Sequence, residues 1–169
     1  MVSNNNLLEK KYTLTKSYWG IFDTILDTTG FGAHWLKDIE ISKIVAEKIH
    51  SFDKKRYHLI AYCIMTNQVH LLIDTDGFRF KTDKSSLGKT SNYPLADTMR
   101  LLKGSTGRQC NKVLGRTGSF WQKESYDHCV RNTEELQRII KYILCNPVKA
   151  GLVEKWKDWP FTYLEEFST

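Results

Sequence analysis

The sequence has no long apolar run and few cysteines. No stretch reaches the roughly 18 consecutive apolar residues of a membrane-spanning helix, and the polar start at residues 1–6 has no signal-peptide core. We therefore expect no membrane association and a cytoplasmic location. The cysteines form no C-x-x-C pair, which argues against both a zinc cluster and a disulfide framework; they are Cys63, Cys110, Cys129 and Cys145.

Acidic residues are the minority charge in a chain of moderate length. The 169 residues carry 19 Asp and Glu against 25 Lys and Arg, a net charge of +6, and 41% of them are hydrophobic. This length suits one well-buried core, so a single domain over residues 1–169 is expected. The positive charge favours a polyanionic partner, although a merely solvated basic surface explains it equally well.

The first part of the chain predicts one strand and two helical segments. Residues 11–16 give a weak strand signal, and apolar residues then recur at helical spacing from Trp19 to Leu26. Asp38 is the expected N-cap of an amphipathic helix that extends to Phe52.

A hairpin is expected in the middle of the chain. Residues 57–65 are apolar on both faces, as in a central strand, and residues 68–75 alternate between apolar and polar. The segment 76–93 that follows is polar, basic and aperiodic, which indicates an exposed, flexible loop.

The remaining elements complete an α+β pattern. A helix is expected to begin at Pro94, with a short strand at 126–131 and a last helix from the N-cap Asn132 to Pro147. The first of these helices should bury a stripe that consists of Leu95, Met99, Leu102, Thr106, Cys110 and Val113. The order of elements predicts a ferredoxin-like fold, a four-stranded antiparallel sheet with helices on one side.

Two potential metal ligands lie on one face of the second hairpin strand. Gln68 and His70 are two residues apart, so their side chains project in the same direction, and Asp74 continues that face. An imidazole and a carboxamide oxygen can hold a hard divalent ion that keeps water ligands. On this pattern alone, a surface or hydrogen-bonded histidine with no metal is the better reading.

The last helix carries a possible nucleophile. Tyr142 and Asn146 are four residues apart and share a face at the edge of the apolar stripe. Tyr142 could attack a phosphorus atom while Asn146 supplies a further ligand, or Tyr142 could simply cover the core. An ordinary tyrosine has a pKa near 10, so the attack would need a cation or a base.

Basic side chains could hold a nucleic-acid backbone. Four of them lie on the exposed side of the helix that begins at Pro94, and two more flank the last helix. A solvated helix face is the alternative. The six residues are Arg100, Lys103, Arg108, Lys112, Arg131 and Lys149.

Several blocks of the sequence, and the order in which they follow one another, resemble the REP-associated tyrosine transposases. This family belongs to the HUH-superfamily single-strand DNA transposases of bacterial insertion sequences. The blocks include the hairpin segment AYCIMTNQVH and the helix segment YILCNPVKAGLV. The ordered blocks lie at residues 35–36, 52–57, 61–70, 115–128, 142–153 and 158–160.

The resemblance implies a Mg²⁺- or Mn²⁺-dependent strand transferase. Such an enzyme cleaves single-stranded DNA beside a hairpin and leaves a 5′-phosphotyrosine and a free 3′-hydroxyl. On matching positions, Tyr142 is the nucleophile, and His70 and Asn146 are metal ligands. Gln68 stands where the family has the first histidine of its His-hydrophobic-His motif, which weakens the expected metal site. Relatives act as monomers or homodimers, and the sequence leaves both open.

Two other functions stay open. A silent hairpin-DNA-binding protein that kept the fold and lost the metal is favoured by Gln68. An RNA-binding ferredoxin-like domain would instead stack bases on exposed sheet aromatics. In the leading reading, a DNA strand transferase, Phe120 and Trp121 could stack unpaired bases, although burial in the core is the better reading of Trp121.

Overall fold

A computed structural model describes residues 18–24, 33–76, 78, 94–123 and 125–165, with backbone only at 18–24 and 94. The expected strand at 11–16 lies outside these residues. So does the expected loop at 76–93, apart from Asp76 and Phe78.

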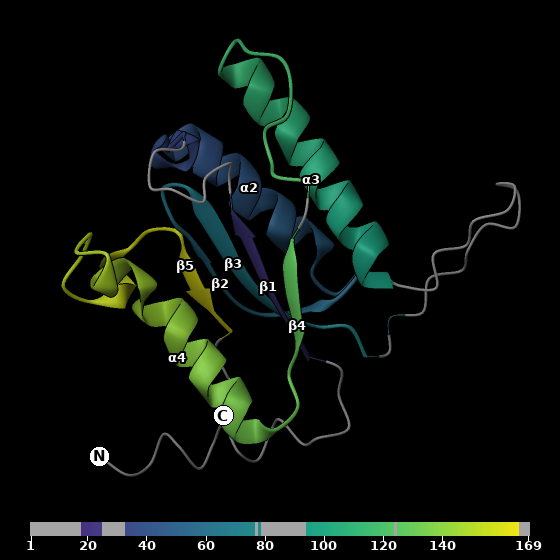
Figure 1. The fold of residues 1–169 in the computed structure, drawn as a ribbon, viewed down its shortest axis with the longest axis vertical. Coiled ribbons are helices and arrows are strands. Elements are labelled where there is room, and N and C mark those ends of the chain that lie inside the picture. Colours follow the sequence, from purple (N-terminus) through teal and green to yellow (C-terminus); the bar gives the residue numbers. More distant parts are fainter. Residues whose placement is uncertain (1–17, 25–32, 77, 79–93, 124, 166–169) are drawn as a thin grey trace, which may run out of the picture.

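The described residues form one five-stranded antiparallel sheet with the strand order β4-β1-β3-β2-β5 (Figure 1). Two expectations are corrected here. Residues 18–24, which include most of the segment with helical spacing from Trp19 to Leu26, form a strand that pairs along its whole length with the central strand β3. The sheet also has a fifth strand, which was not expected. The strands are β1 (Tyr18–Thr24), β2 (His58–Ile64), β3 (Gln68–Asp74), β4 (Tyr126–Cys129) and β5 (Thr162–Leu164).

Three α-helices accompany the sheet, α2 (Ile39–Phe52), α3 (Pro94–Val113) and α4 (Thr133–Lys149). Single 3₁₀ turns, η1 and η2, occupy Trp35–Lys37 and Trp156–Asp158. Both expected N-caps are confirmed, since Asp38 accepts from the Glu40 N–H and Asn132 from the Glu135 N–H, each at 2.8 Å. Among the described helices, none combines the length and the apolar character needed to cross a bilayer.

Pro147 does not end α4 where the sequence predicted. The helix continues to Lys149, with Pro147 buried inside its last turn. A proline removes one backbone donor and crowds the carbonyl four residues earlier, but the next amides can still bond. Here the Ala150 N–H reaches the Asn146 carbonyl at 2.9 Å, so the helix extends two residues beyond Pro147.

The helices cover both faces of the sheet, and not one face as expected. Val69, Leu71 and Ile73 of β3 pack with α2 and α3, whereas Leu72 packs with α4. Alternate residues of a strand point to opposite faces, so β3 is buried from both sides. Along β2 a register shift between Leu59 and Ala61 interrupts the same alternation.

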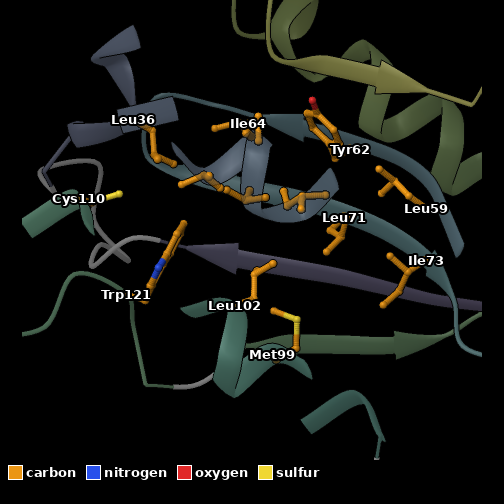
Figure 2. Close-up of a cluster of buried hydrophobic side chains, with 14 of the residues drawn as sticks. Leu36, Leu59, Tyr62, Ile64, Leu71, Ile73, Met99, Leu102, Cys110 and Trp121 are labelled. Carbon is orange, nitrogen blue, oxygen red and sulfur yellow. The ribbon is translucent and has the colours of Figure 1, made fainter. Parts of the chain in front are cut away.

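The larger cluster lies between the sheet and the pair α2 and α3. Figure 2 shows Leu71 and Ile73 of β3 directed toward the same cluster as Met99 and Leu102 of α3. The predicted buried stripe of α3 is confirmed apart from Val113, which is 41% exposed. Both sides of the central strands are therefore apolar interfaces, which fixes the pairing register.

Truncation of neighbouring residues on β3 tests this two-faced burial. Leu71→Ala and Leu72→Ala should each lower the free energy of unfolding by about 2–5 kcal/mol, because each leaves a cavity in a different cluster. Chemical denaturation measures the loss. Val113→Ala, at an exposed position of α3, is the control and should change stability by less than about 0.5 kcal/mol. A small effect for either Leu variant would contradict burial of both faces.

Candidate active site

His70 lies in the middle of β3 on the face that α4 covers. It shares this face with Leu72, which packs against α4, and with Gln68 at the start of the strand. His70 is 3% exposed and Gln68 is half-buried. The Gln68 carbonyl accepts from the Met65 N–H at 2.7 Å and closes the hairpin. The two side chains predicted to share a face therefore both emerge toward α4.

Tyr142 of α4 meets His70 directly. The two rings pack edge to face, with centroids 5.4 Å apart and an interplanar angle of 80°. Tyr142 is also 42% exposed, so a ligand can approach its ring from solvent. The ammonium of Lys149 lies 5.3 Å from the centroid of the same ring. A histidine, a phenol and a cation thus meet at one partly open position.

Asn146 stands one turn after Tyr142 on α4. Its side chain is buried, and Nδ2 donates to the Tyr142 carbonyl at 3.0 Å. This bond holds the amide nitrogen against the helix, so the Oδ1 atom is the part of the carboxamide left to accept or coordinate. Tyr142 and Asn146 share a helix face as the sequence predicted, and that face is turned to the sheet.

Burial sets the charge state of His70. Removal from water disfavours the imidazolium and lowers the pKa of His70 to about 4. The ring is therefore neutral at pH 7. A neutral imidazole is the form that coordinates a metal ion.

The donor set fits a hard divalent ion held by few protein atoms. Gln68, His70 and Asn146 offer one imidazole nitrogen and two carboxamide oxygens, which suits Mg²⁺ or Mn²⁺ with most of its coordination completed by water and substrate. Within the described parts of the chain, no group of three His, Cys, Asp or Glu side chains could hold a metal. An ion held by Gln68, His70 and Asn146 alone would have no carboxylate ligand.

The α3 side of the molecule carries two adjacent grooves rich in cations. The first, here the Trp121 groove, has a volume of about 560 Å³ and includes Arg100, Lys103 and Lys123. The second, the Phe52 groove, has about 400 Å³; its lining residues are Lys48, Phe52, Arg56, Arg100, Leu101, Gly104, Ser105 and Arg108. Arg100 and Gly104 line both, and no acidic residue of the described chain lines either groove, although Asp97 pairs with Arg100 at 3.5 Å.

The grooves separate the six cations that the sequence singled out. Arg100, Lys103 and Arg108 line a groove, and Lys112 is exposed further along α3. Lys149 lies beside Tyr142 instead. Arg131, between β4 and α4, donates its backbone N–H to Glu135 Oε2 at 2.7 Å.

Sequence reasoning missed the groove cations Lys48, Arg56 and Lys123. Lys48 and Arg56 both lie over the Phe52 ring, at 4.4 and 5.4 Å from its centroid. Lys48 and Arg56 are each four residues from Phe52, and this spacing is a sequence signal that could have grouped them around its ring. Their proximity to α3 arises only from packing.

A loop motif builds the wall of the Trp121 groove. Arg116 stacks on Trp35 at 3.8 Å, and Trp35 in turn stacks on Phe120. The Trp121 indole donates to the Thr106 hydroxyl at 2.8 Å. Phe120 and Trp121 are both buried, so the idea that they stack unpaired bases is wrong.

Comparison with known proteins adds relatives to this geometry. No protein-family model matches the chain. A Haemophilus influenzae protein assigned to the REP-associated tyrosine transposases is 28% identical over 106 residues, which is 63% of this chain. The REP-associated tyrosine transposase of Escherichia coli is 41% identical over 44 residues, 26% of this chain.

A solved structure shares the fold. It is a REP-associated tyrosine transposase bound to a REP hairpin, with a TM-score of 0.59, 19% identity, and coverage of 90% of this chain and 79% of that one. This chain is a relative of the REP-associated tyrosine transposases. The matched segments span only 58% and 27% of the Haemophilus and E. coli transposases.

The buried histidine of this transposase relative predicts a pH dependence. An unfolded histidine binds a proton below about pH 6.5, whereas His70 in the metal-free fold does so only near pH 4. The unfolded state therefore gains protons first, so stability is complete above pH 6.5 and is lost as the pH falls toward 4. The loss due to His70 should be on the order of 3 kcal/mol.

Chemical denaturation of the wild type and of His70→Asn at several pH values between 6.5 and 4 measures the loss of stability that is due to His70. The variant should lose less stability on acidification than the wild type does. His34→Gln, at an exposed histidine, is the control and should keep the wild-type slope. An identical slope for His70→Asn would show that the imidazole titrates normally.

Proposed function

We propose that this protein cleaves and rejoins single-stranded DNA beside a hairpin, with Tyr142 as the nucleophile. The observation that carries the proposal is the contact between Tyr142 and His70. Their ring centroids lie 5.4 Å apart, although the two residues are far apart in the sequence. Packing of α4 on the sheet brings a phenol to a neutral imidazole at a partly exposed position. A phenol beside a possible metal ligand suits attack on a phosphodiester.

The proposed reaction exchanges one phosphodiester bond for another. The Tyr142 oxygen forms a bond to phosphorus, the bond from phosphorus to the 3′ oxygen breaks, and a 5′-phosphotyrosine results. The phenol proton passes to solvent, and the released 3′ oxygen takes up a proton from solvent. One phosphodiester replaces another, so a 3′-hydroxyl can reverse the step without an external energy source.

The surrounding residues have separable roles in this proposal. Lys149 lies over the Tyr142 ring, where its positive charge attracts the phosphate that the phenol would attack. His70, Gln68 and Asn146 would hold Mg²⁺ or Mn²⁺, which when bound supplies Lewis-acid polarisation of the phosphate. The hydrogen bond from Asn146 Nδ2 to the Tyr142 backbone carbonyl holds the Asn146 side chain against α4.

The two grooves supply a surface for the hairpin backbone. Arg100 is shared by both grooves, so cations run continuously across the outer side of α3. Lys and Arg side chains that neutralise phosphates provide affinity that does not depend on sequence. A known relative of this fold is bound to a REP hairpin, which favours a hairpin as the ligand here.

A covalent adduct tests the proposed chemistry. Incubation of the protein with a labelled DNA hairpin that has a single-stranded flank, in the presence of Mn²⁺, should give a protein–DNA band on a denaturing gel. Tyr142→Phe keeps the ring contact with His70 but has no nucleophile, so the band should disappear. The control Tyr163→Phe alters a tyrosine of β5 and should leave the band unchanged.

A silent hairpin-binding protein is the second candidate, and Gln68 favours it. A carboxamide is a poorer ligand than an imidazole, and no carboxylate compensates among the three proposed ligands. Gln68→His distinguishes the candidates. An enzyme weakened at this position should form adduct at least roughly tenfold faster with the restored histidine. Hairpin binding without adduct in both forms would establish the silent binder.

Salt dependence tests the grooves. The double variant Arg100→Gln with Arg108→Gln should bind the hairpin more weakly and reduce the slope of log K against log[salt] by roughly 0.9 for each lost phosphate contact. Fluorescence anisotropy at several salt concentrations measures the slope. Lys43→Gln is a matched control, since Lys43 is exposed on α2 and lines neither groove. An equal reduction in the control would mean that the charge acts diffusely.

A further inference from the structure

Tyr126 is a large aromatic residue exposed on the edge of the sheet. It is the first residue of β4, the outermost strand, and its side chain is 67% exposed. Most large aromatic residues of the described chain are at least partly buried, so this exposure is unusual here. Tyr126 is neither the proposed nucleophile nor a proposed metal ligand.

Strand pairing places Tyr126 on the same face as His70. Tyr126 pairs with residue 22 of β1, and residue 22 pairs with His70 of β3. Directly paired residues of antiparallel strands project from the same face, so Tyr126 and His70 both point to the α4 side. Two strand spacings separate them, roughly 10 Å. Tyr126 therefore stands on the tyrosine side of the sheet at a short distance from the site.

The start of β4 also adjoins the Trp121 groove. The Lys103 ammonium, which lines that groove, donates to the Ser125 hydroxyl at 3.0 Å. Ser125 immediately precedes Tyr126, and Lys123 of the same segment lines the groove as well. The chain thus passes directly from the Trp121 groove to the start of β4, and this edge of the sheet connects the cationic α3 side with the α4 side.

We propose that Tyr126 stacks on an unpaired base of single-stranded DNA that passes around this edge, from the Trp121 groove to Tyr142. The inference rests on the proposed function. An exposed phenol ring offers a face to any base, and the adjacent cations of the groove hold the backbone that enters. Among the described residues, the two acidic groups nearest in the chain do not block this face. Asp127 projects from the opposite face, and Glu135 accepts from His128 and from the Arg131 N–H.

Fluorescence of a base analogue tests the stacking. The probe is a DNA hairpin whose single-stranded flank carries a fluorescent adenine analogue at successive positions. Stacking on Tyr126 should quench the analogue at one position or at neighbouring positions in the wild type and in Tyr126→Phe, but not in Tyr126→Ala. Affinity for the flanked hairpin should fall roughly 5- to 100-fold in Tyr126→Ala, as for loss of one stacked base.

A hairpin without the flank and a second exposed position provide the controls. All variants should bind the unflanked hairpin equally, and Ile39→Ala, at an apolar side chain exposed at the start of α2, should bind both probes as the wild type does. Tyr126→Phe should also keep the covalent adduct, since a stacking ring needs no hydroxyl. Unchanged quenching and affinity in Tyr126→Ala would overturn the inference. Failure of the wild type to bind any hairpin would instead overturn the proposed function.

Discussion

Burial of β3 on both faces is the constraint on which the site depends. Val69, Leu71 and Ile73 must point into the cluster under α2 and α3, so His70 and Leu72 must point to α4. A slip of one residue would bury an imidazole in the larger cluster and turn three apolar side chains toward α4. Because both faces are apolar interfaces, such a slip is strongly disfavoured. The position of His70 is thus a consequence of the core and needs no separate stabilisation.

The position of Tyr142 depends on how α4 is anchored at both ends. At its start, Glu135 accepts from His128 of β4 at 2.9 Å and from the Arg131 N–H, while Asn132 caps the first turn. These hydrogen bonds lower the pKa of the Glu135 carboxyl, which keeps it ionised. Beyond the helix, the Trp159 indole donates to the Ile64 carbonyl of β2 at 2.9 Å. The chain is thus tied to the edge strand β4 before the helix and to β2 after it, so the middle of α4 crosses the strands that lie between them, β1 and β3.

Hydrophobic periodicity predicted the elements whose apolar and polar residues follow one regular pattern of burial and exposure. The alternation of β3, the stripe of α3 and both N-caps follow from local sequence. The pattern failed at β1, where the spacing of apolar residues is helical but pairing with β3 and β4 decides the structure. It also missed β5, whose three residues are too short for a periodic signal. The face that α4 covers is a tertiary outcome that no local pattern contains.

The same distinction applies to the site. That Gln68 and His70 share a face, and that Tyr142 and Asn146 do, follows from strand and helix geometry. The contact between His70 and Tyr142 required the packing of α4, and the grooves required α2 and α3 to lie side by side. The pattern of cations along α3 gave no indication that Lys48 and Arg56 would line the same groove.

The fold separates the cation-lined grooves from the tyrosine by the thickness of the sheet. Groove residues come from α2, α3 and the loop after α3, whereas Tyr142 and its neighbours come from β3 and α4. A change at Gln68 alters only the second group, because its side chain projects away from α2 and α3. Loss of a metal ligand there leaves the grooves intact. Under the proposed function, one substitution at Gln68 therefore removes cleavage and leaves the groove surface unchanged, whereas loss of the groove charges impairs both cleavage and hairpin binding.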